Sequence, residues 1–247
     1  TTLLDTLLRS HPDLVVVEEK PMVRVLEQAV GALPGGYPGA LADLDAAALL
    51  ELRAAYFEEL SRHAEPVSGG QRVVDKLPFN LAHAGLLQRV FPRARFILAL
   101  RHPCDAVLSA YMRSFELNEA MVNFLDLEDT AALYAEVMTL WQRYRELLPL
   151  SVHTVRYEDL VAAVEPTLTP LLAFLGLEWH PALADHVGTA RARGDIQTPS
   201  YHQVVEPVYT RASGRWQRYR EGLAPVLPVL QPWLGEWGYG SAAPMGE

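Results

Sequence analysis

The segment Arg95–Arg113, RFILALRHPCDAVLSAYMR, decides the fold of this chain. Its first part, Arg95–Leu100, is apolar after the leading arginine, which is the pattern of a strand buried on both faces. Arg101 ends that run, and Pro103 suits the first turn of a helix. The segment therefore predicts a strand that passes directly into a helix ending near Phe115.

The rest of the chain repeats this succession of short apolar runs and helical patterns. Further strands are predicted at Leu14–Val17, Arg72–Asp75 and Val152–Arg156. Helices are predicted at Thr1–Ser10, Pro21–Val30, Asp45–His63, Asn80–Val90, Asp126–Leu148 and Pro166–Leu175, with shorter ones at Pro181–His186 and near Trp216 and Trp233. Alternating strands and helices indicate an α/β fold of three layers, in which a central parallel sheet is flanked by helices.

The composition is that of a globular chain with a large core. Half of the 247 residues are hydrophobic, and no repeat, low-complexity tract or linker divides them, so a single domain over residues 1–247 is predicted. No run of about 18 apolar residues is present, which argues against a membrane span. No signal peptide is recognisable, although the chain begins with Thr1 rather than Met.

Charge and cysteine content restrict the possible partners. The formal charge is −9 at pH 7, which argues against a nucleic-acid partner because such binding needs a basic face. A small anionic ligand is still compatible, since a local cluster of Arg and Lys can bind a polyanion within acidic surroundings. Cys104 is the only cysteine, and the histidines lack metal-ligand spacing, so neither a disulfide nor a metal is expected.

Charged and polar side chains follow the predicted strands directly. These residues are Glu18, Glu19, Lys20, Lys76, Arg101 and Tyr157. In parallel sheets, ligands bind beyond the carboxyl ends of the strands. The functional site is therefore expected where these side chains meet.

Arg101, Ser109 and Arg113 form a pattern that suits phosphate binding. Ser109 comes eight residues after Arg101, and it lies four residues before Arg113 on the same face of the predicted helix. Two guanidinium groups and a hydroxyl can close on one phosphate. The alternative is that Arg101 pairs with Asp105 or another carboxylate, while Ser109 is merely solvated.

This segment resembles the 3'-phosphate-binding motif of sulfotransferases that use 3'-phosphoadenosine 5'-phosphosulfate (PAPS). Other segments resemble the same family in the same order along the chain: Ser10–Asp13 with Glu19, Val74–Pro78, Arg156–Leu160, Phe174–Leu177 and Tyr209–Tyr219. They are similar above all to tyrosylprotein sulfotransferases and to bacterial sulfotransferases associated with helical repeats. The resemblance implies a P-loop NTPase-like fold, PAPS as co-substrate, no metal, and sulfuryl transfer to a hydroxyl or amine.

The resemblance also implies which residues bind the donor. Arg101, Ser109 and Arg113 would bind the 3'-phosphate. Tyr157 would contact the adenine, and a core position for this tyrosine is the equal alternative. In the loop that closes over the donor, the resemblance places Arg215 as a donor ligand and Ser213 among the catalytic residues.

Thr1 and Thr2 resemble the last residues of the family's 5'-phosphosulfate loop, which leads into a helix. Backbone N–H groups at a helix N-terminus are a natural anion site. The resemblance therefore implies an N-terminally truncated domain that lacks most of this loop and the first strand of the sheet. We expect this chain of 247 residues to bind the donor poorly and the complete protein to be active.

The catalytic residues implied by the resemblance are Glu19 and Lys76, beside Ser213. Glu19 would take the proton of the acceptor as general base. Glu18 is its rival, and continued strand alternation would point the two carboxylates to opposite sides. Lys76 would face the transferring group, unless it forms a surface pair with Asp75. His83 is the reserve candidate for the base.

Two other classes of function stay open from the sequence. One is a P-loop-type phosphotransferase or kinase, which a requirement for magnesium would distinguish; the other is a non-catalytic domain that keeps the fold. The acceptor, a small molecule, carbohydrate or peptide, is not readable, although Gly31–Ala40, Phe115–Phe124 and Thr189–Gln203 are expected to shape its cleft. The oligomeric state is also open. A bacterial, cytoplasmic protein is expected from the family and from the lack of targeting features.

Overall fold

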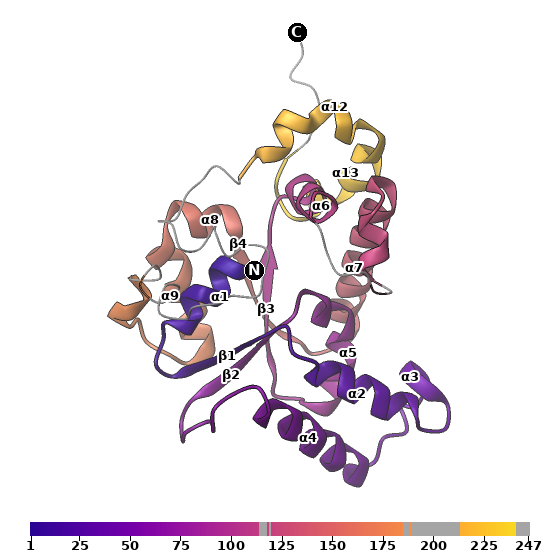
Figure 1. Cartoon of the computed structure of the whole chain (residues 1–247), viewed down its shortest axis with the longest axis vertical. Helices are drawn as coiled ribbons and strands as arrows, with labels where there is room; N and C mark the ends of the chain where they lie inside the picture. Colours follow the sequence, from indigo (N-terminus) through magenta and orange to yellow (C-terminus); the bar gives the residue numbers. More distant parts are fainter. Residues whose placement is uncertain (114–117, 119, 185–187, 189–212, 241–247) are drawn as a thin grey trace.

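The computed structural model describes residues 1–113, 118, 120–184, 188 and 213–240. In these ranges the strands are β1 (Leu14–Glu18), β2 (Arg72–Lys76), β3 (Arg95–Leu100) and β4 (Ser151–Arg156). The α-helices are α1 (Thr2–Arg9), α2 (Met22–Gly31), α3 (Gly36–Gly39), α4 (Ala46–Ser61), α5 (Ala84–Val90), α6 (Pro103–Tyr111), α7 (Leu127–Leu147), α8 (Tyr157–Ala162), α9 (Val164–Leu175), α12 (Arg220–Leu223) and α13 (Leu227–Glu236). Short 3-10 turns are η1 (Pro78–His83), η2 (Met121–Phe124), η3 (Pro181–Ala184), η4 (Arg215–Tyr219) and η5 (Ala224–Val226). Figure 1 shows the strands in the middle of the molecule and the helices around them.

The strands follow the sequence-based prediction closely. β3 covers the predicted Arg95–Leu100, while β1 and β2 each continue one residue further, to Glu18 and Lys76. β4 begins one residue early, at Ser151. The extra residues at the ends of β1 and β2 are charged, so they bring charged side chains to the edge where a ligand was expected.

Some predicted helices differ at their ends. The predicted helix Asn80–Val90 is divided, because the chain first forms the 3-10 turn η1 and becomes α-helical from Ala84. α6 ends at Tyr111, and Phe115, where it was predicted to end, lies outside the described residues. The predicted loop Gly31–Ala40 contains the single helical turn α3.

The C-terminal third is described in part. The predicted helix Pro181–His186 is a 3-10 turn as far as Ala184, and its last two residues lie outside the described residues. The predicted loop Thr189–Gln203 also lies outside them. The helices predicted near Trp216 and Trp233 are η4 and α13.

The strands are parallel, as predicted, but they form separate pairs rather than one continuous sheet. β1 pairs with β2 so that Glu18 lies opposite Lys76, and β3 pairs with β4 so that Leu100 lies opposite Arg156. Parallel pairing puts both strand ends of a pair at the same edge. Each pair therefore delivers the residues that follow its strands to one place.

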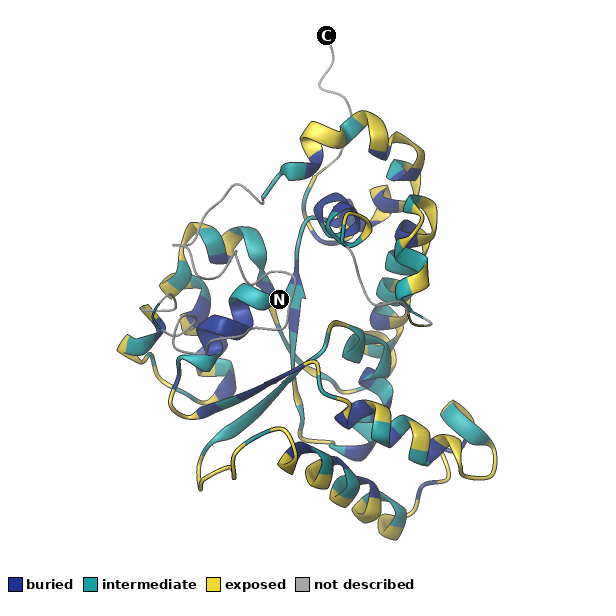
Figure 2. Ribbon diagram, in the orientation of Figure 1, coloured by how far each residue is buried: buried dark blue, intermediate teal, exposed yellow. Residues whose placement is uncertain are grey.

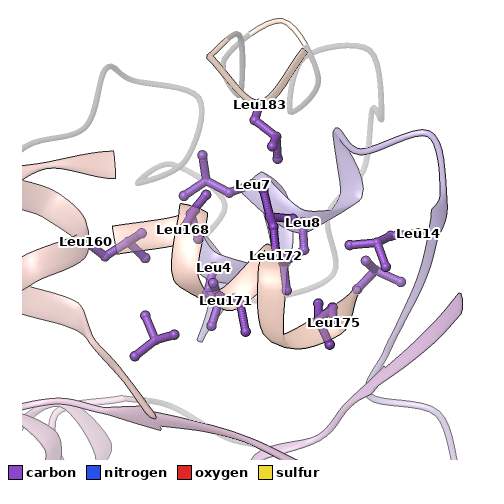
Figure 3. Close-up of a cluster of buried hydrophobic side chains, with 12 residues drawn as sticks. Leu4, Leu7, Leu8, Leu14, Leu160, Leu168, Leu171, Leu172, Leu175 and Leu183 are labelled. Atoms are coloured by element: carbon purple, nitrogen blue, oxygen red, sulfur yellow. The ribbon is translucent and has the colours of Figure 1, made fainter. Parts of the chain in front are cut away.

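A cluster of leucines packs α1 against α9 and fixes the position of the N-terminal helix (Figure 3). Its labelled members are Leu4, Leu7, Leu8, Leu14, Leu160, Leu168, Leu171, Leu172, Leu175 and Leu183. α1 presents its apolar face at helical spacing, and Gly176 ends α9 in the left-handed conformation at φ 70°. Burial of these side chains helps to hold the first turn of α1 beside the strand ends.

Further buried clusters lie under the other helices (Figure 2). One joins α2, α4 and α5 to β1, and another packs α6 against α7 and α13 around the fully buried Cys104. In the described ranges, no helix combines the length and the apolar character that a membrane crossing requires.

Leu172→Ala tests the leucine cluster. Leu172 is 1% exposed in α9, so its truncation should lower the free energy of unfolding by about 2–5 kcal/mol through lost burial and a cavity. The measurement is chemical denaturation of the purified protein. The control is Leu147→Ala at the end of α7, which is 74% exposed and should change stability by less than about 0.5 kcal/mol. Equal effects of the two substitutions would refute this packing.

Candidate active site

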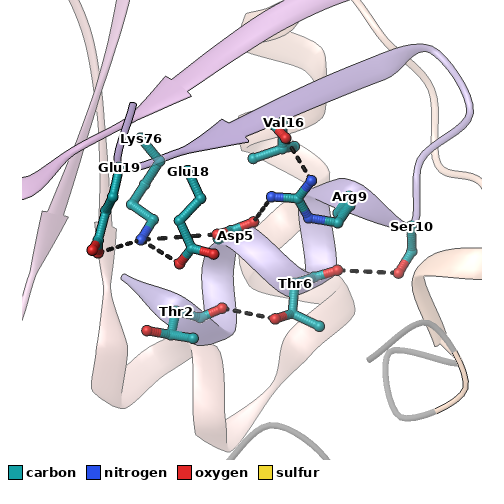
Figure 4. A network of polar contacts seen from close by, with 9 residues as sticks. All are labelled: Thr2, Asp5, Thr6, Arg9, Ser10, Val16, Glu18, Glu19 and Lys76. Carbon is teal, nitrogen blue, oxygen red and sulfur yellow. Dashed lines mark hydrogen bonds and ion pairs between the residues drawn. The ribbon is translucent and has the colours of Figure 1, made fainter. Parts of the chain in front are cut away.

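The ammonium group of Lys76, at the end of β2, lies among three carboxylates (Figure 4). Its Nζ atom is 2.6 Å from Glu18 Oε1, 3.0 Å from Glu19 Oε1 and 3.9 Å from Asp5 Oδ2. The Lys76 side chain is only 12% exposed, so these interactions are partly shielded from water. We call Asp5, Glu18, Glu19 and Lys76 the strand-end network.

The alternative of a surface pair between Lys76 and Asp75 is wrong. Asp75 accepts hydrogen bonds from Tyr56 Oη at 2.9 Å and Asn80 Nδ2 at 3.1 Å. Adjacent residues of a strand point to opposite faces, so Asp75 faces α4 and η1 while Lys76 faces α1. Burial raises the pKa of Asp75, and its two hydrogen bonds oppose that rise.

Glu18 and Glu19 both reach Lys76, which the expectation of continued strand alternation did not allow. β1 ends at Glu18, and Glu19 adopts the left-handed conformation at φ 52° while its N–H donates to the Lys76 carbonyl at 2.8 Å. A non-glycine residue in this conformation is uncommon, and strained residues of this kind cluster at functional sites. The turn at Glu19 brings the second carboxylate to the same ammonium group.

The two carboxylates differ in environment. The Glu18 side chain is 6% exposed and the Glu19 side chain 44% exposed. Glu18 also acts on Asp5, whose pKa is raised mainly by burial and further by Glu18. Glu19 is therefore the carboxylate that an incoming molecule can reach.

Asp5 is a member of this network that the sequence analysis did not identify. Its side chain is fully buried, and Arg9 binds it at 2.9 Å while also donating to the Val16 carbonyl. The available signal was an acidic residue among the leucines of α1, four residues before an arginine. Through Arg9, Asp5 joins the strand-end network to β1.

Positive charges converge on Thr1, the residue before α1. The charges of Lys76, Arg101 and, more weakly, Arg113 act at its backbone nitrogen. Thr1 itself remains accessible to solvent. Figure 1 shows this end of the chain in the middle of the molecule. Cations from β2, β3 and the segment after α6 thus lie around one helix N-terminus.

Arg101 lies at the end of β3, beside the first residue of α8. Its guanidinium carbon is 5.2 Å from the centre of the Tyr157 ring, which is a cation–π distance. Ser109 is half-buried on α6, and Arg113 follows that helix, also half-buried. Thr2 begins α1 and accepts a hydrogen bond from Thr6 at 2.9 Å.

The segment that contains Ser213 and Arg215 lies against α6. Arg215 Nη2 is 3.4 Å from Met112 Sδ, and the Asp105 carboxylate accepts hydrogen bonds from Gly214 and Trp216 in this segment. Both oxygens of Asp105 are therefore engaged by the C-terminal segment. Sequence reasoning had considered Asp105 only as an ion-pair partner for Arg101.

His83, the reserve candidate for the base, contacts a different set of residues. Tyr37 Oη is 3.3 Å from its Nδ1, and Glu27 Oε2 is 4.0 Å from its Nε2. Burial raises the pKa of Tyr37 to about 12, with Tyr144 and Glu27 adding to the rise. This arrangement joins η1 to α2 and α3. The contacts given above for Lys76 are with the three carboxylates, and His83 is not among them.

Residues 1–181 match the Sulfotransferase family. An uncharacterised protein of Aquifex aeolicus is 29% identical over 94% of this chain and 31% of its own length. Protein-tyrosine sulfotransferase 1 of Danio rerio is 27% identical over 97% of this chain and 69% of its own length. The solved sulfotransferase domain from the Synechococcus PCC 7002 olefin synthase superposes with a TM-score of 0.56 at 20% identity, covering 87% of this chain and 82% of that chain.

The chain spans less than a third of the Aquifex protein and about two thirds of the fish enzyme. The likeness to the solved domain concerns the fold, and it confirms the predicted α/β class with parallel strands.

His102→Asn tests the environment around Arg101. The ring centres of His102 and Trp216 are 4.9 Å apart, and the rings are stacked. Burial is the largest cause that lowers the pKa of His102. The charge of Arg101 lowers this pKa further, while Asp105 and Glu158 raise it. Below the ordinary histidine pKa of about 6.5, His102 binds a proton in the unfolded chain but not in the folded chain. The free energy of unfolding should therefore fall as the pH drops.

The measurement is the urea midpoint at about pH 7.5 and about pH 5.5, on either side of the ordinary histidine pKa. His102→Asn should lose less stability between these two values than the unaltered protein. Substitution of the exposed His180 by Asn serves as the control and should leave the loss unchanged. An equal loss in all three proteins would contradict the role of His102.

Proposed function

The chain belongs to the sulfotransferase family, and on this premise we propose that it transfers a sulfuryl group from PAPS to a hydroxyl or amine acceptor. The observation that carries the proposal is the strand-end network beside a helix N-terminus surrounded by cations. It supplies a reachable carboxylate and a cation within 3.0 Å of each other. Proton removal and charge stabilisation are the two tasks that such a transfer sets.

The 3'-phosphate of the donor binds Arg101, Ser109 and Arg113 in this proposal. The supporting observations are the position of Arg101 at a strand end and the positive charge that Arg101 and Arg113 both contribute at the backbone nitrogen of Thr1. Guanidinium groups suit a phosphate dianion because they can donate pairs of hydrogen bonds to it. Tyr157, next to Arg101, contacts the adenine ring.

The sulfate end of the donor lies at the first turn of α1. Thr1 and Thr2 contribute to the binding of the 5'-phosphosulfate. The cationic surroundings of the Thr1 backbone nitrogen favour an anion at this position. Ser213 and Arg215 cover the donor from the opposite side, against α6.

Glu19 acts as the general base. The acceptor hydroxyl gives its proton to Glu19 as its oxygen forms a bond to sulfur, and the bond from sulfur to the 5'-phosphate oxygen breaks with its electron pair. Lys76 stabilises the negative charge that grows on that leaving oxygen. Both carboxylates bind Lys76, but Glu19 is preferred to Glu18 because its side chain is 44% exposed whereas that of Glu18 is 6% exposed.

A tyrosyl hydroxyl is one candidate acceptor, since the relatives named by their activity are protein-tyrosine sulfotransferases. We also propose that the chain is a single catalytic domain of a cytoplasmic, bacterial protein.

A P-loop-type phosphotransferase is the weaker candidate. Asp75, the carboxylate that would hold magnesium at a strand end, is bound instead by Tyr56 and Asn80.

Glu19→Gln should lower kcat for transfer from sulfur-labelled PAPS by about 10²- to 10⁴-fold, which is the usual contribution of a positioned base. Binding of the product nucleotide, 3'-phosphoadenosine 5'-phosphate (PAP), should be retained. The matched variant is Glu18→Gln, for which a smaller fall in kcat is expected. Loss of transfer in Glu18→Gln with normal transfer in Glu19→Gln would assign the base to Glu18.

Arg101→Ala should weaken PAP binding by about 10- to 100-fold, because a charge-assisted hydrogen bond to phosphate is lost. Isothermal titration calorimetry with the complete protein measures this directly. Arg95→Ala, at the opposite end of the same strand, is the matched control and should bind PAP normally. If Arg101→Ala bound PAP as tightly as the control, the 3'-phosphate site would be wrong.

A further inference from the structure

Asp105, in the first turn of α6, is a buried acid with both carboxylate oxygens in use. The residue is 1% exposed. Its Oδ2 accepts the N–H of Gly214 and its Oδ1 accepts the N–H of Trp216, each at 2.7 Å. One side chain thus fixes two backbone positions that lie more than a hundred residues further along the chain.

The geometry of the C-terminal segment depends on these two hydrogen bonds. Gly214 has φ 69°, a left-handed conformation that lets the chain turn around the carboxylate. Trp216 is buried and stacks on His102, the residue before α6, with ring centres 4.9 Å apart. The backbone from Gly214 to Trp216 is therefore held on both sides of Arg215.

The anchored segment directs Arg215 along one face of α6. Arg215 Nη2 lies 3.4 Å from Met112 Sδ, and Met112 is seven residues after Asp105. Residues four and seven positions apart share a helix face, so Ser109 lies between Asp105 and Met112 on that face. Arg215 consequently reaches the C-terminal end of α6, the half of the helix that carries Ser109 and leads to Arg113.

Asp105 is a poor candidate for direct contact with an anionic donor. A carboxylate beside a phosphate would repel it, and Asp105 is already satisfied by two N–H groups at the positive end of a helix dipole. Any effect of Asp105 on the donor must therefore pass through the segment that it holds.

We propose that Asp105 is a positioning residue for donor binding, which places Arg215 over the 3'-phosphate site by fixing the backbone of Gly214 and Trp216. This inference rests on the proposed function, since it presumes a 3'-phosphorylated nucleotide on α6. In this role the buried acid Asp105 holds Arg215 in its binding position before the donor arrives. Without Asp105, part of the binding energy would be spent on ordering Arg215.

The test is a double-mutant cycle on PAP affinity in the complete protein, measured by isothermal titration calorimetry. Asp105→Asn replaces one acceptor oxygen by an NH₂ group and should weaken PAP binding about tenfold. Arg215→Ala should weaken it by a similar factor. If Asp105 acts through Arg215, the double variant should bind about as weakly as Arg215→Ala alone, rather than about a hundredfold more weakly than the unaltered protein.

A second measurement tests, in the absence of any donor, whether Asp105 holds the backbone of Gly214 and Trp216. Trypsin cleaves after arginine, so cleavage between Arg215 and Trp216 should be about tenfold faster in Asp105→Asn, because the released backbone opens more often. The matched control is Asp126→Asn, since Asp126 also accepts two backbone N–H groups, from Glu128 and Asp129 at the start of α7. The control should alter neither cleavage at Arg215 nor PAP affinity.

The outcomes separate the two proposals. Normal PAP binding by Asp105→Asn, or effects that multiply fully in the double variant, would overturn the positioning role while leaving the donor assignment intact. Failure of the unaltered protein to bind PAP would overturn the donor assignment and the positioning role together. In that case, faster cleavage in Asp105→Asn would show a structural anchor only.

Discussion

The ammonium group of Lys76 is the interaction on which the arrangement of this chain depends. It binds carboxylates from the end of β1 and approaches the buried Asp5 of α1, so it joins two strands and a helix at one edge. Burying a charge without a partner is costly. Arg9 binds the other carboxylate oxygen of the buried Asp5. The N-terminal helix is thereby held where its first turn meets the strand ends.

A chain with a formal charge of −9 can still offer a site for an anion, because a few cations that lie close together can bind one within acidic surroundings. Parallel strands deliver Lys76 and Arg101 to the edges of their pairs, and α6 leads to Arg113. All three charges act at the backbone nitrogen of Thr1. The proposed site thus gathers cations through ordinary α/β geometry, with Asp5, Glu18 and Glu19 beside Lys76.

Local patterns were sufficient to predict the strands and most helices, because each carries its own periodicity and end signals. They could not predict that Glu19 leaves the strand in a left-handed conformation, since that depends on its hydrogen bond to Lys76. The approach of Lys76 to Asp5 and the partners of Asp105 were also beyond reach, because they come from packing between distant segments. The pairing of strands into separate sheets likewise depends on contacts that no single segment encodes.

The most direct measurement of the central claim is a crystal structure of the complete protein with PAP and an acceptor analogue bound. The account predicts the 3'-phosphate on Arg101 and Ser109, the 5'-phosphate at the first turn of α1, and the acceptor oxygen within hydrogen-bond distance of Glu19. A nucleotide bound away from the strand ends, or an acceptor oxygen that Glu19 cannot reach, would contradict it.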